Sequence, residues 1–273
     1  MSFGNGNALM SISDLISRLF DFLNVRRCLV CREPIAKTQD LCPECFAVYK
    51  KELSAECGIC GKRLCECSCS NALLSKHGVK RMVKLFRYRP AETDEHSLNL
   101  LLYRLKHHYI KDLHTFMAQH LAEALEACIG TPKPCVITFV PRTVREKRKY
   151  GFDQSAEMAK ALSLRTGIPF AALLRRNRRA SPQKKMRSAE ERIKNAKDSY
   201  LTASAEDLRG KTVFLLDDAV TTGASIAACA HLLRKMGAKE IIAVAPFISF
   251  RHKNIHFEHM KNSREERFYL KSK

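Results

Sequence analysis

The stretch LLDDAVTTGAS, residues 215–225, limits the folds open to this chain more than any other feature. An apolar run (213–216) ends in the adjacent carboxylates Asp217 and Asp218, and a loop rich in hydroxyl groups leads into a helical pattern. A buried strand that turns directly into a helix is typical of an α/β fold with a parallel sheet. Ligands of such sheets bind beyond the carboxyl ends of the strands, so we expect the two carboxylates to lie at a binding site.

The chain after residue 80 repeats this alternation of strand and helix patterns. Apolar runs predict strands at residues 82–88, 136–140, 213–217 and 241–247. Helical spacing of apolar residues, and a capping box SAEE before the fourth element, predict helices at residues 95–107, 112–127, 153–166, 188–197 and 222–236. This order of elements predicts βαβ units, and therefore a parallel sheet flanked by helices.

The loop after the two carboxylates is suited to binding an anion. Its N–H groups and the dipole of the following helix would point at a phosphate, and hydroxyl groups come from Thr221, Thr222 and Ser225. A phosphate on this loop, with two carboxylates accepting hydrogen bonds from vicinal hydroxyls, describes a ribose 5-phosphate site. Because adjacent carboxylates repel each other, we expect a cation or a hydrogen-bond donor beside them. The alternative is a capped helix next to an acidic Mg²⁺ site.

Nine of the twelve cysteines lie between residues 28 and 69. The first four follow the spacing C-x2-C-x10-C-x2-C and are Cys28, Cys31, Cys42 and Cys45. Two C-x2-C turns direct four thiolates at one centre, which is the closed tetrahedral arrangement that zinc prefers. This spacing predicts a zinc site.

A second run, CGICGKRLCECSCS, supplies one further C-x2-C turn and three closely spaced thiols. We predict a second metal site on Cys57, Cys60, Cys67 and Cys69, with Cys65 competing as a ligand with the last two. A disulfide framework is the alternative for both runs. We disfavour it because the N-terminus does not resemble an export signal.

The N-terminal residues differ from a secretory signal, since Asp14, Arg18 and Asp21 interrupt their apolar side chains. Residues 11–24 instead predict an amphipathic helix that docks onto the protein. No apolar run approaches the ~18 residues of a membrane span, and we expect a cytoplasmic protein. The chain therefore divides into an amphipathic N-terminal helix, a zinc-ribbon module, an α/β domain and a basic C-terminal tail, at residues 1–26, 27–72, 80–250 and 251–273.

Lysine and arginine outnumber aspartate and glutamate by 48 to 28, a formal net charge of +20. Two blocks concentrate these cations, RTVREKRK (142–149) and RRNRRASPQKKMR (175–187). Such blocks attract polyanions through their phosphates, and they would equally suit a small phosphorylated ligand. Few aromatic residues interleave with the blocks, so the sequence predicts no base-stacking platform of the kind that single-strand binders use.

Several stretches together resemble the ComF (competence protein F) family of phosphoribosyltransferase-like proteins. The resemblance is carried, in order, by YRLKHH (103–108), FVPRTVREKRKYGFDQ (139–154), PQKKMRSAEERIKN (182–195) and LLDDAVTTGAS (215–225). The N-terminal helix and the cysteine pairs resemble the zinc-ribbon head of that family. The resemblance implies a type I phosphoribosyltransferase-like fold, a parallel sheet flanked by helices, with a small N-terminal cysteine-rich zinc-ribbon module.

The last stretch resembles the motif that binds phosphoribosyl diphosphate (PRPP), and the resemblance implies roles for matching residues. Asp217 and Asp218 would bind the ribose hydroxyls, with Mg²⁺ accompanying PRPP. Lys106 and the basic loop after Arg142 would neutralise the leaving pyrophosphate, which Pro141 and Arg142 would cradle through an unusual peptide bond. The ligand would be held by the residues between the acidic pair and the helix, namely Ala219, Val220, Thr221, Thr222, Gly223, Ala224 and Ser225.

The chain departs from the family pattern in one block, which usually reads R-G-F-N-Q. Tyr150 stands in place of the arginine and Asp153 in place of the asparagine, and Arg148 could compensate for the first change. These departures leave the role of the block open. The sequence contains no recognisable nucleobase pocket either.

Two functions remain open at this level. The resemblance to the ComF family implies a binding module that handles incoming single-stranded DNA inside the cell during natural transformation, alongside other DNA-uptake proteins. PRPP or a related ribose 5-phosphate ligand would then occupy its site. As an enzyme, the chain would be a phosphoribosyltransferase that moves ribose 5-phosphate from PRPP to a nitrogen nucleophile. The intact acidic pair favours the enzyme, whereas the missing acceptor site favours the binding module.

Overall fold

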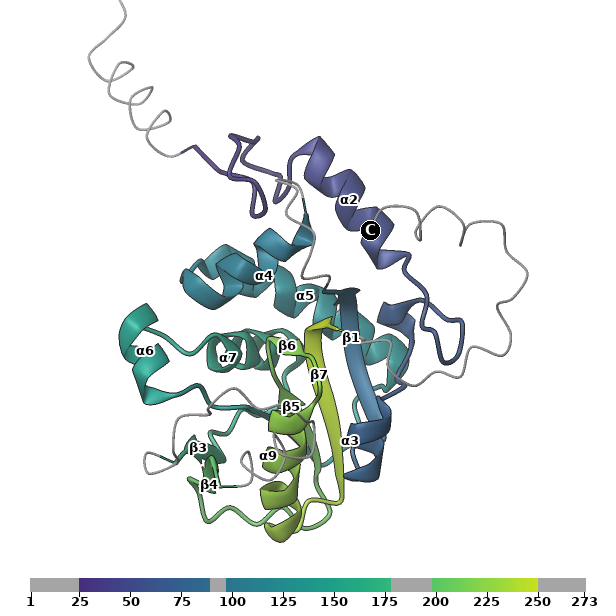
Figure 1. Cartoon of the computed structure of the whole chain (residues 1–273), viewed down its shortest axis with the longest axis vertical. Helices are drawn as coiled ribbons and strands as arrows, with labels where there is room; N and C mark the ends of the chain where they lie inside the picture. The colour runs from purple at the N-terminus through teal and green to yellow at the C-terminus, as the bar shows by residue number, and fades with distance from the viewer. Residues whose placement is uncertain (1–24, 89–96, 178–197, 250–273) are drawn as a thin grey trace, which may run out of the picture.

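The computed structural model describes residues 25–88, 97–177 and 198–249 (Figure 1). Some expected features lie outside these described residues. They are the N-terminal helix at residues 11–24, the helix at 188–197, most of the second basic block, and the tail from residue 251 onward.

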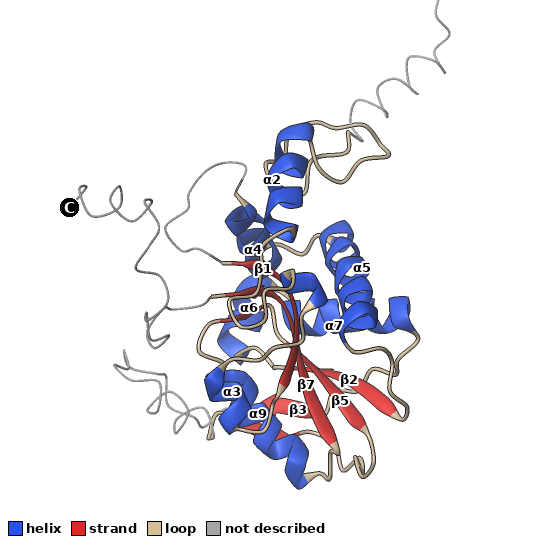
Figure 2. Cartoon of the chain, turned by 90° about the vertical axis from the view of Figure 1, so that its right-hand side faces the viewer, coloured by secondary structure: helices blue, strands red, loops and turns tan. Residues whose placement is uncertain are grey.

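A parallel sheet forms the centre of the fold, in the strand order β1–β7–β5–β2 (Figure 2). Each neighbouring pair in this order is parallel, and the short strand β6 pairs with the end of β7. The predicted parallel α/β sheet is therefore confirmed. The strands are β1 (Arg81–Arg87), β2 (Cys135–Phe139), β5 (Thr212–Leu216), β6 (Ala219–Val220) and β7 (Glu240–Ile248).

Alternate residues of the central strands β5 and β7 belong to two separate hydrophobic clusters, one on each face of the sheet. In β5, Phe214 and Leu216 join one cluster while Val213 and Leu215 join the other. Because both faces are covered, the central strands are apolar throughout, as the sequence pattern indicated. Figure 2 shows the helices of the two faces on opposite sides of the sheet. The first face carries α4 (Leu98–His107), α5 (Lys111–Cys128) and α7 (Gln154–Thr166).

The second face carries α9 (Ala224–Lys235), α3 (Ala72–Lys76) and an antiparallel pair of short strands, β3 (Leu174–Arg176) and β4 (Tyr200–Thr202). The sequence pattern predicted α9 but neither α3 nor the short strand pair. Elements of three to five residues contain too little of a period to be recognised in a sequence.

The cysteine-rich segment packs against the open edge of β1. It contains α2 (Pro43–Leu53) and the 3₁₀ helix η1 (Leu64–Glu66). Ser68 O accepts a hydrogen bond of 2.8 Å from Met82 N–H in β1, and the ring of Tyr49 in α2 lies 5.4 Å from that of Phe86. An uncovered edge strand could pair with another chain, so this segment protects the sheet as well as carrying its thiols.

The helix α6 (Val144–Tyr150) occupies the place where the sequence suggested a basic loop after Arg142. Its cause is local. Thr143 and Glu146 form a reciprocal capping box at its start, and Gly151 ends it in the left-handed conformation, with φ of 79°. Because its apolar residues have no helical period, the hydrophobic pattern did not reveal it.

Among the described helices, none has both the length and the apolar character needed to cross a membrane.

Candidate functional site

The loop between β5 and α9 forms a small pocket at the carboxyl end of the sheet. The pocket has a volume of about 50 Å³ and is lined by Asp217 and residues 219–226. Gly223 is the N-cap of α9, and no side chain caps the helix there. The Ala224 N–H at the start of α9 donates to Thr222 Oγ1 over 3.3 Å, which places this hydroxyl where the sequence predicts an anion.

Gly223 is required at its position for two reasons. Its φ of 85° lies in the left-handed region, and an added Cβ would come within 2.7 Å of Leu74 Cγ. Leu74 belongs to α3, and Asn71, the N-cap of α3, donates a hydrogen bond of 3.4 Å to Thr222 O. The segment that follows the cysteines therefore supports the pocket loop directly.

The acidic pair is held by hydrogen-bond donors from α7, which supplies the kind of partner that two crowded carboxylates need. Gln154 Nε2 donates to Asp218 Oδ2 over 2.7 Å, and Ser155 Oγ donates to Asp217 Oδ1 over 3.3 Å. Asp217 Oδ1 also accepts from the backbone N–H of Asp218 over 3.0 Å. Gln154 belongs to the quoted GFDQ stretch, but the sequence assigned it no role.

Burial, followed by the neighbouring charge of Asp218, raises the pKa of Asp217 well above its usual range. The charge of Lys106 acts in the opposite direction and lowers this pKa. Lys106, in the last turn of α4, is therefore electrostatically coupled to the acidic pair.

Arg142 lies at the end of β2 and connects the elements around the pocket. Its backbone N–H donates to Asp153 Oδ2 over 3.0 Å, and its Nη2 donates to Lys106 O over 2.8 Å. Asp153 also caps α7 and forms an ion pair of 2.9 Å with Lys147. The structure thus brings Lys106 and Arg142 together. Asp153 links the backbone of Arg142 to the start of α7.

The unusual peptide bond that the resemblance implies in the loop of Pro141 and Arg142 is not a cis bond. In the described ranges, the cis peptide bond joins Lys133 and Pro134 instead.

Tyr150, which replaces the arginine of the family pattern, packs against Arg142. The Arg142 guanidinium lies 4.7 Å above the centre of the Tyr150 ring. The His107 ring also contacts the Tyr150 ring, and their centroids lie 4.7 Å apart. Burial and the charges of Arg142 and Lys106 lower the pKa of His107, which favours its neutral form. Arg148 is exposed on α6.

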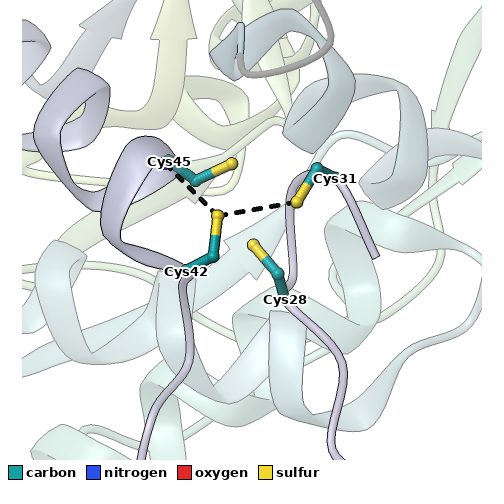
Figure 3. Close-up of side chains that lie close together, drawn as sticks. All are labelled: Cys28, Cys31, Cys42 and Cys45. Atoms are coloured by element: carbon teal, nitrogen blue, oxygen red, sulfur yellow. Dashed lines mark hydrogen bonds between the residues drawn. The ribbon is translucent and has the colours of Figure 1, made fainter. Parts of the chain in front are cut away.

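Eight cysteines gather into two clusters of four. Cys28, Cys31, Cys42 and Cys45 form the first cluster (Figure 3), and Cys57, Cys60, Cys67 and Cys69 form the second. Within each cluster the four sulfur atoms lie within 4.8 Å of one another. All twelve cysteines fall within the described residues and all are free thiols, so the disulfide alternative has no support. The structure therefore contains two cysteine clusters that could each hold a metal ion.

Cys65, the competing ligand in the second run, lies outside the second cluster. Its thiol points to Leu53 O, with Sγ at 3.8 Å. Cys128 also lies apart from both clusters and donates to Cys65 O over 3.2 Å.

Lys84 is a functional candidate that the sequence reasoning missed. It is fully buried in β1, and its Nζ donates to Cys67 O over 2.9 Å and to Cys69 O over 2.8 Å. The Nζ also lies 3.3 Å from Cys67 Sγ. The sequence did indicate Lys84 in one way, because it is a lysine within an otherwise apolar strand pattern.

The sequence of the chain is similar to that of a protein family and of several known proteins. Residues 149–265 match the family model "Phosphoribosyl transferase domain". Competence protein F of Haemophilus influenzae is 27% identical over 231 residues, which cover 82% of this chain and 96% of that protein. DNA utilization protein YhgH of Salmonella typhi is 26% identical over 220 residues, covering 78% of this chain and 93% of that protein.

Solved structures of phosphoribosyltransferases also match part of the chain. Adenine phosphoribosyltransferase from Thermoanaerobacter pseudethanolicus matches with 20% identity and a TM-score of 0.33, covering 51% of this chain and 81% of that one. Glutamine PRPP amidotransferase from B. subtilis matches with 20% identity and a TM-score of 0.36, covering 52% of this chain and 30% of that one.

Proposed function

We propose that this chain, a ComF-like homologue of competence protein F with a phosphoribosyl transferase domain, binds a ribose 5-phosphate ligand and handles single-stranded DNA in the cytoplasm. One observation carries the first part of this proposal. Two adjacent carboxylates stand beside the N-terminus of α9, whose N-cap Gly223 has no capping side chain, and Gln154 and Ser155 hold those carboxylates in place.

The two halves of the site match the two ends of a ribose 5-phosphate. The 5-phosphate would accept hydrogen bonds from the N–H groups of the loop, with hydroxyl donors from Thr221, Thr222 and Ser225. The ribose hydroxyls would donate to Asp217 and Asp218. Because Gln154 and Ser155 already donate to one oxygen of each carboxylate, the pair is oriented before the ligand arrives.

A pyrophosphate on the ribose would extend toward the cationic side of the site. Lys106 and Arg142 lie together there, joined by the hydrogen bond from Arg142 Nη2 to Lys106 O. Mg²⁺ would accompany PRPP, bound chiefly by ligand oxygens and water, as is usual for this ion. PRPP is therefore the ribose 5-phosphate compound that we propose for this site.

We propose zinc as the metal of both cysteine clusters. The fit rests on the donor set, because four thiolates within reach of one centre suit zinc and disfavour the hard cations Mg²⁺ and Ca²⁺. A hydrogen bond from the Lys62 backbone lowers the pKa of Cys60 to about 7, which assists deprotonation of a ligand. Bound zinc would hold the cysteine-rich segment against β1, and through α3 against the pocket loop.

Single-stranded DNA is proposed as the macromolecular partner. The relatives are named for DNA utilization and for competence. The chain carries a net charge of +20, and part of that charge lies on α6, which begins two residues after Arg142. Such a surface attracts a phosphate backbone whatever its base sequence.

A working phosphoribosyltransferase is the second candidate, favoured by the acidic pair and by the cations beside it. In that reaction a nitrogen nucleophile displaces pyrophosphate from the ribose, and Lys106 and Arg142 stabilise the departing charge.

The decisive experiment titrates the purified, metal-loaded chain by calorimetry with PRPP·Mg²⁺, ribose 5-phosphate and a single-stranded oligonucleotide in parallel. Pyrophosphate release is then measured with ammonia and with nucleobases as acceptors. Binding of PRPP and oligonucleotide without pyrophosphate release supports the binding module, and acceptor-dependent release supports the enzyme. Failure to bind any ribose 5-phosphate compound contradicts both assignments of the site.

A further inference from the structure

Aromatic and imidazole rings from separate segments form a row beside the acidic pair. We call it the ring row, and it consists, in spatial order, of Tyr103, His107, Tyr150, Arg142, Phe152 and Tyr109. The ring centres of His107 lie 4.6 Å from Tyr103 and 4.7 Å from Tyr150. The planar Arg142 guanidinium continues the row, at 4.7 Å from Tyr150 and 5.9 Å from Phe152, and Tyr109 lies 5.7 Å beyond Phe152.

Both ends of the ring row are open to solvent. Tyr103 is 54% exposed and Tyr109 is 58% exposed. Among the described residues, the other largely exposed aromatic side chain is Phe46, which belongs to α2. Two of the three exposed large rings therefore lie in this row, which is a concentration that core packing does not require.

Exposed cations lie on α6, the helix that contributes Tyr150 to the ring row. Arg145, Arg148 and Lys149 are exposed on α6, and none makes an ion pair with a residue that the structure describes. Lys149 Nζ lies 4.9 Å from the centre of the Tyr150 ring. Glu146, the acidic residue of α6, is occupied by the capping box with Thr143. The surface thus combines two exposed tyrosine side chains with cations that form no ion pair within the described residues.

We infer that the ring row is a base-stacking surface for single-stranded nucleic acid, with the cations of α6 bound to its phosphates. This inference rests on the proposed handling of single-stranded DNA and specifies where the strand binds. Stacking on rings needs unpaired bases, so the surface selects single strands over duplexes, and it tolerates any base sequence. The proposed surface draws its rings from several segments, and it therefore departs from the expectation from sequence that the basic blocks lack a stacking platform.

Arg142 joins this surface to the ribose 5-phosphate site. Its guanidinium stacks in the ring row, while its Nη2 binds Lys106 O on the cationic side of the pocket. A nucleotide bound at the row is therefore adjacent to the pocket and distinct from the ligand in it.

The test measures oligonucleotide affinity by fluorescence anisotropy, with the full chain in its metal-loaded form. The variants are Tyr103→Ala, Tyr109→Ala and their combination, with Tyr103→Phe and Tyr109→Phe as ring-retaining variants. Phe46→Ala is the matched control, since it removes an exposed ring outside the row. Two probes of equal length are compared, a normal single strand and an abasic strand with the same phosphates.

Each alanine substitution should weaken binding of the normal strand by about 10-fold, in line with the loss of one stacked base. The phenylalanine variants and Phe46→Ala should bind as the parent does. All of the proteins should bind the abasic strand with equal affinity. This affinity should be lower than that of the parent for the normal strand. The salt dependence should not change, because the phosphate contacts remain.

Other outcomes separate this inference from the function on which it rests. If the parent binds the normal strand and the double alanine variant binds it equally well, the ring row is not the binding surface, although DNA handling stands. If the parent binds the abasic strand as tightly as the normal one, stacking is refuted. If the parent binds no single strand even at low salt, the DNA-handling proposal itself fails.

Discussion

Lys84 Nζ lies 3.3 Å from Cys67 Sγ, and the lysine side chain is completely buried. Four thiolates around one divalent zinc would carry a net charge of about −2, and two of these cysteines, Cys57 and Cys67, are buried. A buried ammonium group offsets part of this charge, and its donors satisfy the carbonyl groups of Cys67 and Cys69. Lys84 therefore connects the central sheet to the second cysteine cluster.

Replacing Lys84 with methionine should lower the metal affinity of the second cluster by roughly 10- to 100-fold, the range found for residues that support metal ligands. Competition with a chromogenic chelator measures this change, and elemental analysis follows the metal content. Lys80→Met is the control, because Lys80 is exposed shortly before the same strand. Equal metal affinity in the Lys84 variant and the parent would contradict the role of Lys84.

The cysteine clusters predict two zinc ions per chain. Cys31→Ser and Cys60→Ser should each reduce the metal content toward one ion, because a thiolate is lost from one cluster at a time. Cys65→Ser should leave two ions bound, since Cys65 lies outside both clusters. A parent protein purified without chelator that contains no zinc would contradict the assignment.

The acidic pair predicts a loss of ligand binding without a loss of fold. Asp217→Asn and Asp218→Asn should each weaken PRPP·Mg²⁺ binding roughly ten- to a hundredfold, because a hydrogen bond to a charged group contributes about 1.5–3 kcal/mol. Gln154→Leu should weaken binding in the same direction, since Asp218 loses the donor that orients it. Calorimetry measures the affinities, and Asp207→Asn at the surface serves as the control. Unchanged affinity in both aspartate variants would refute the site.

Asp217 also predicts a pH dependence of stability. Its pKa is raised in the folded chain by burial and by Asp218, so its protonated form contributes stability that is lost as the pH rises through that folded pKa. Asp217→Asn removes the free-energy cost of ionising this buried carboxyl. Without ligand, the variant should melt at a higher temperature than the parent near neutral pH, and the difference should shrink toward about pH 4, where the parent carboxyl is protonated.

Thermal melts of both proteins across this pH range test the prediction. Asp207→Asn should give no stabilisation, because a hydrogen bond from Arg209 lowers the pKa of Asp207. If the difference in melting temperature between the parent and the Asp217 variant does not vary with pH, the raised pKa of Asp217 is contradicted.

Features that depend on neighbouring residues in the chain could be predicted from sequence. The strand that precedes Asp217 and Asp218, the helix α9 and the parallel sheet follow from local apolar periodicity, which reports burial of each segment. The two C-x2-C turns of the first cluster likewise place their thiols by local geometry. In the second run, spacing left three thiols in competition, and the path of the chain after η1 brought Cys67 and Cys69 into the cluster.

Contacts between segments distant in the sequence were decided only by the tertiary structure. Gln154 and Asp218 lie 64 residues apart, and they meet because the β1–β7–β5–β2 order places α7 beside the end of β5. Lys84 reaches the second cluster because the cysteine-rich segment covers the edge of β1. The ring row joins Tyr103 and Tyr109 to a basic helix in the same way. Apolar periodicity specifies which face of a segment is buried but not which segment covers it, because that choice depends on how the whole core packs.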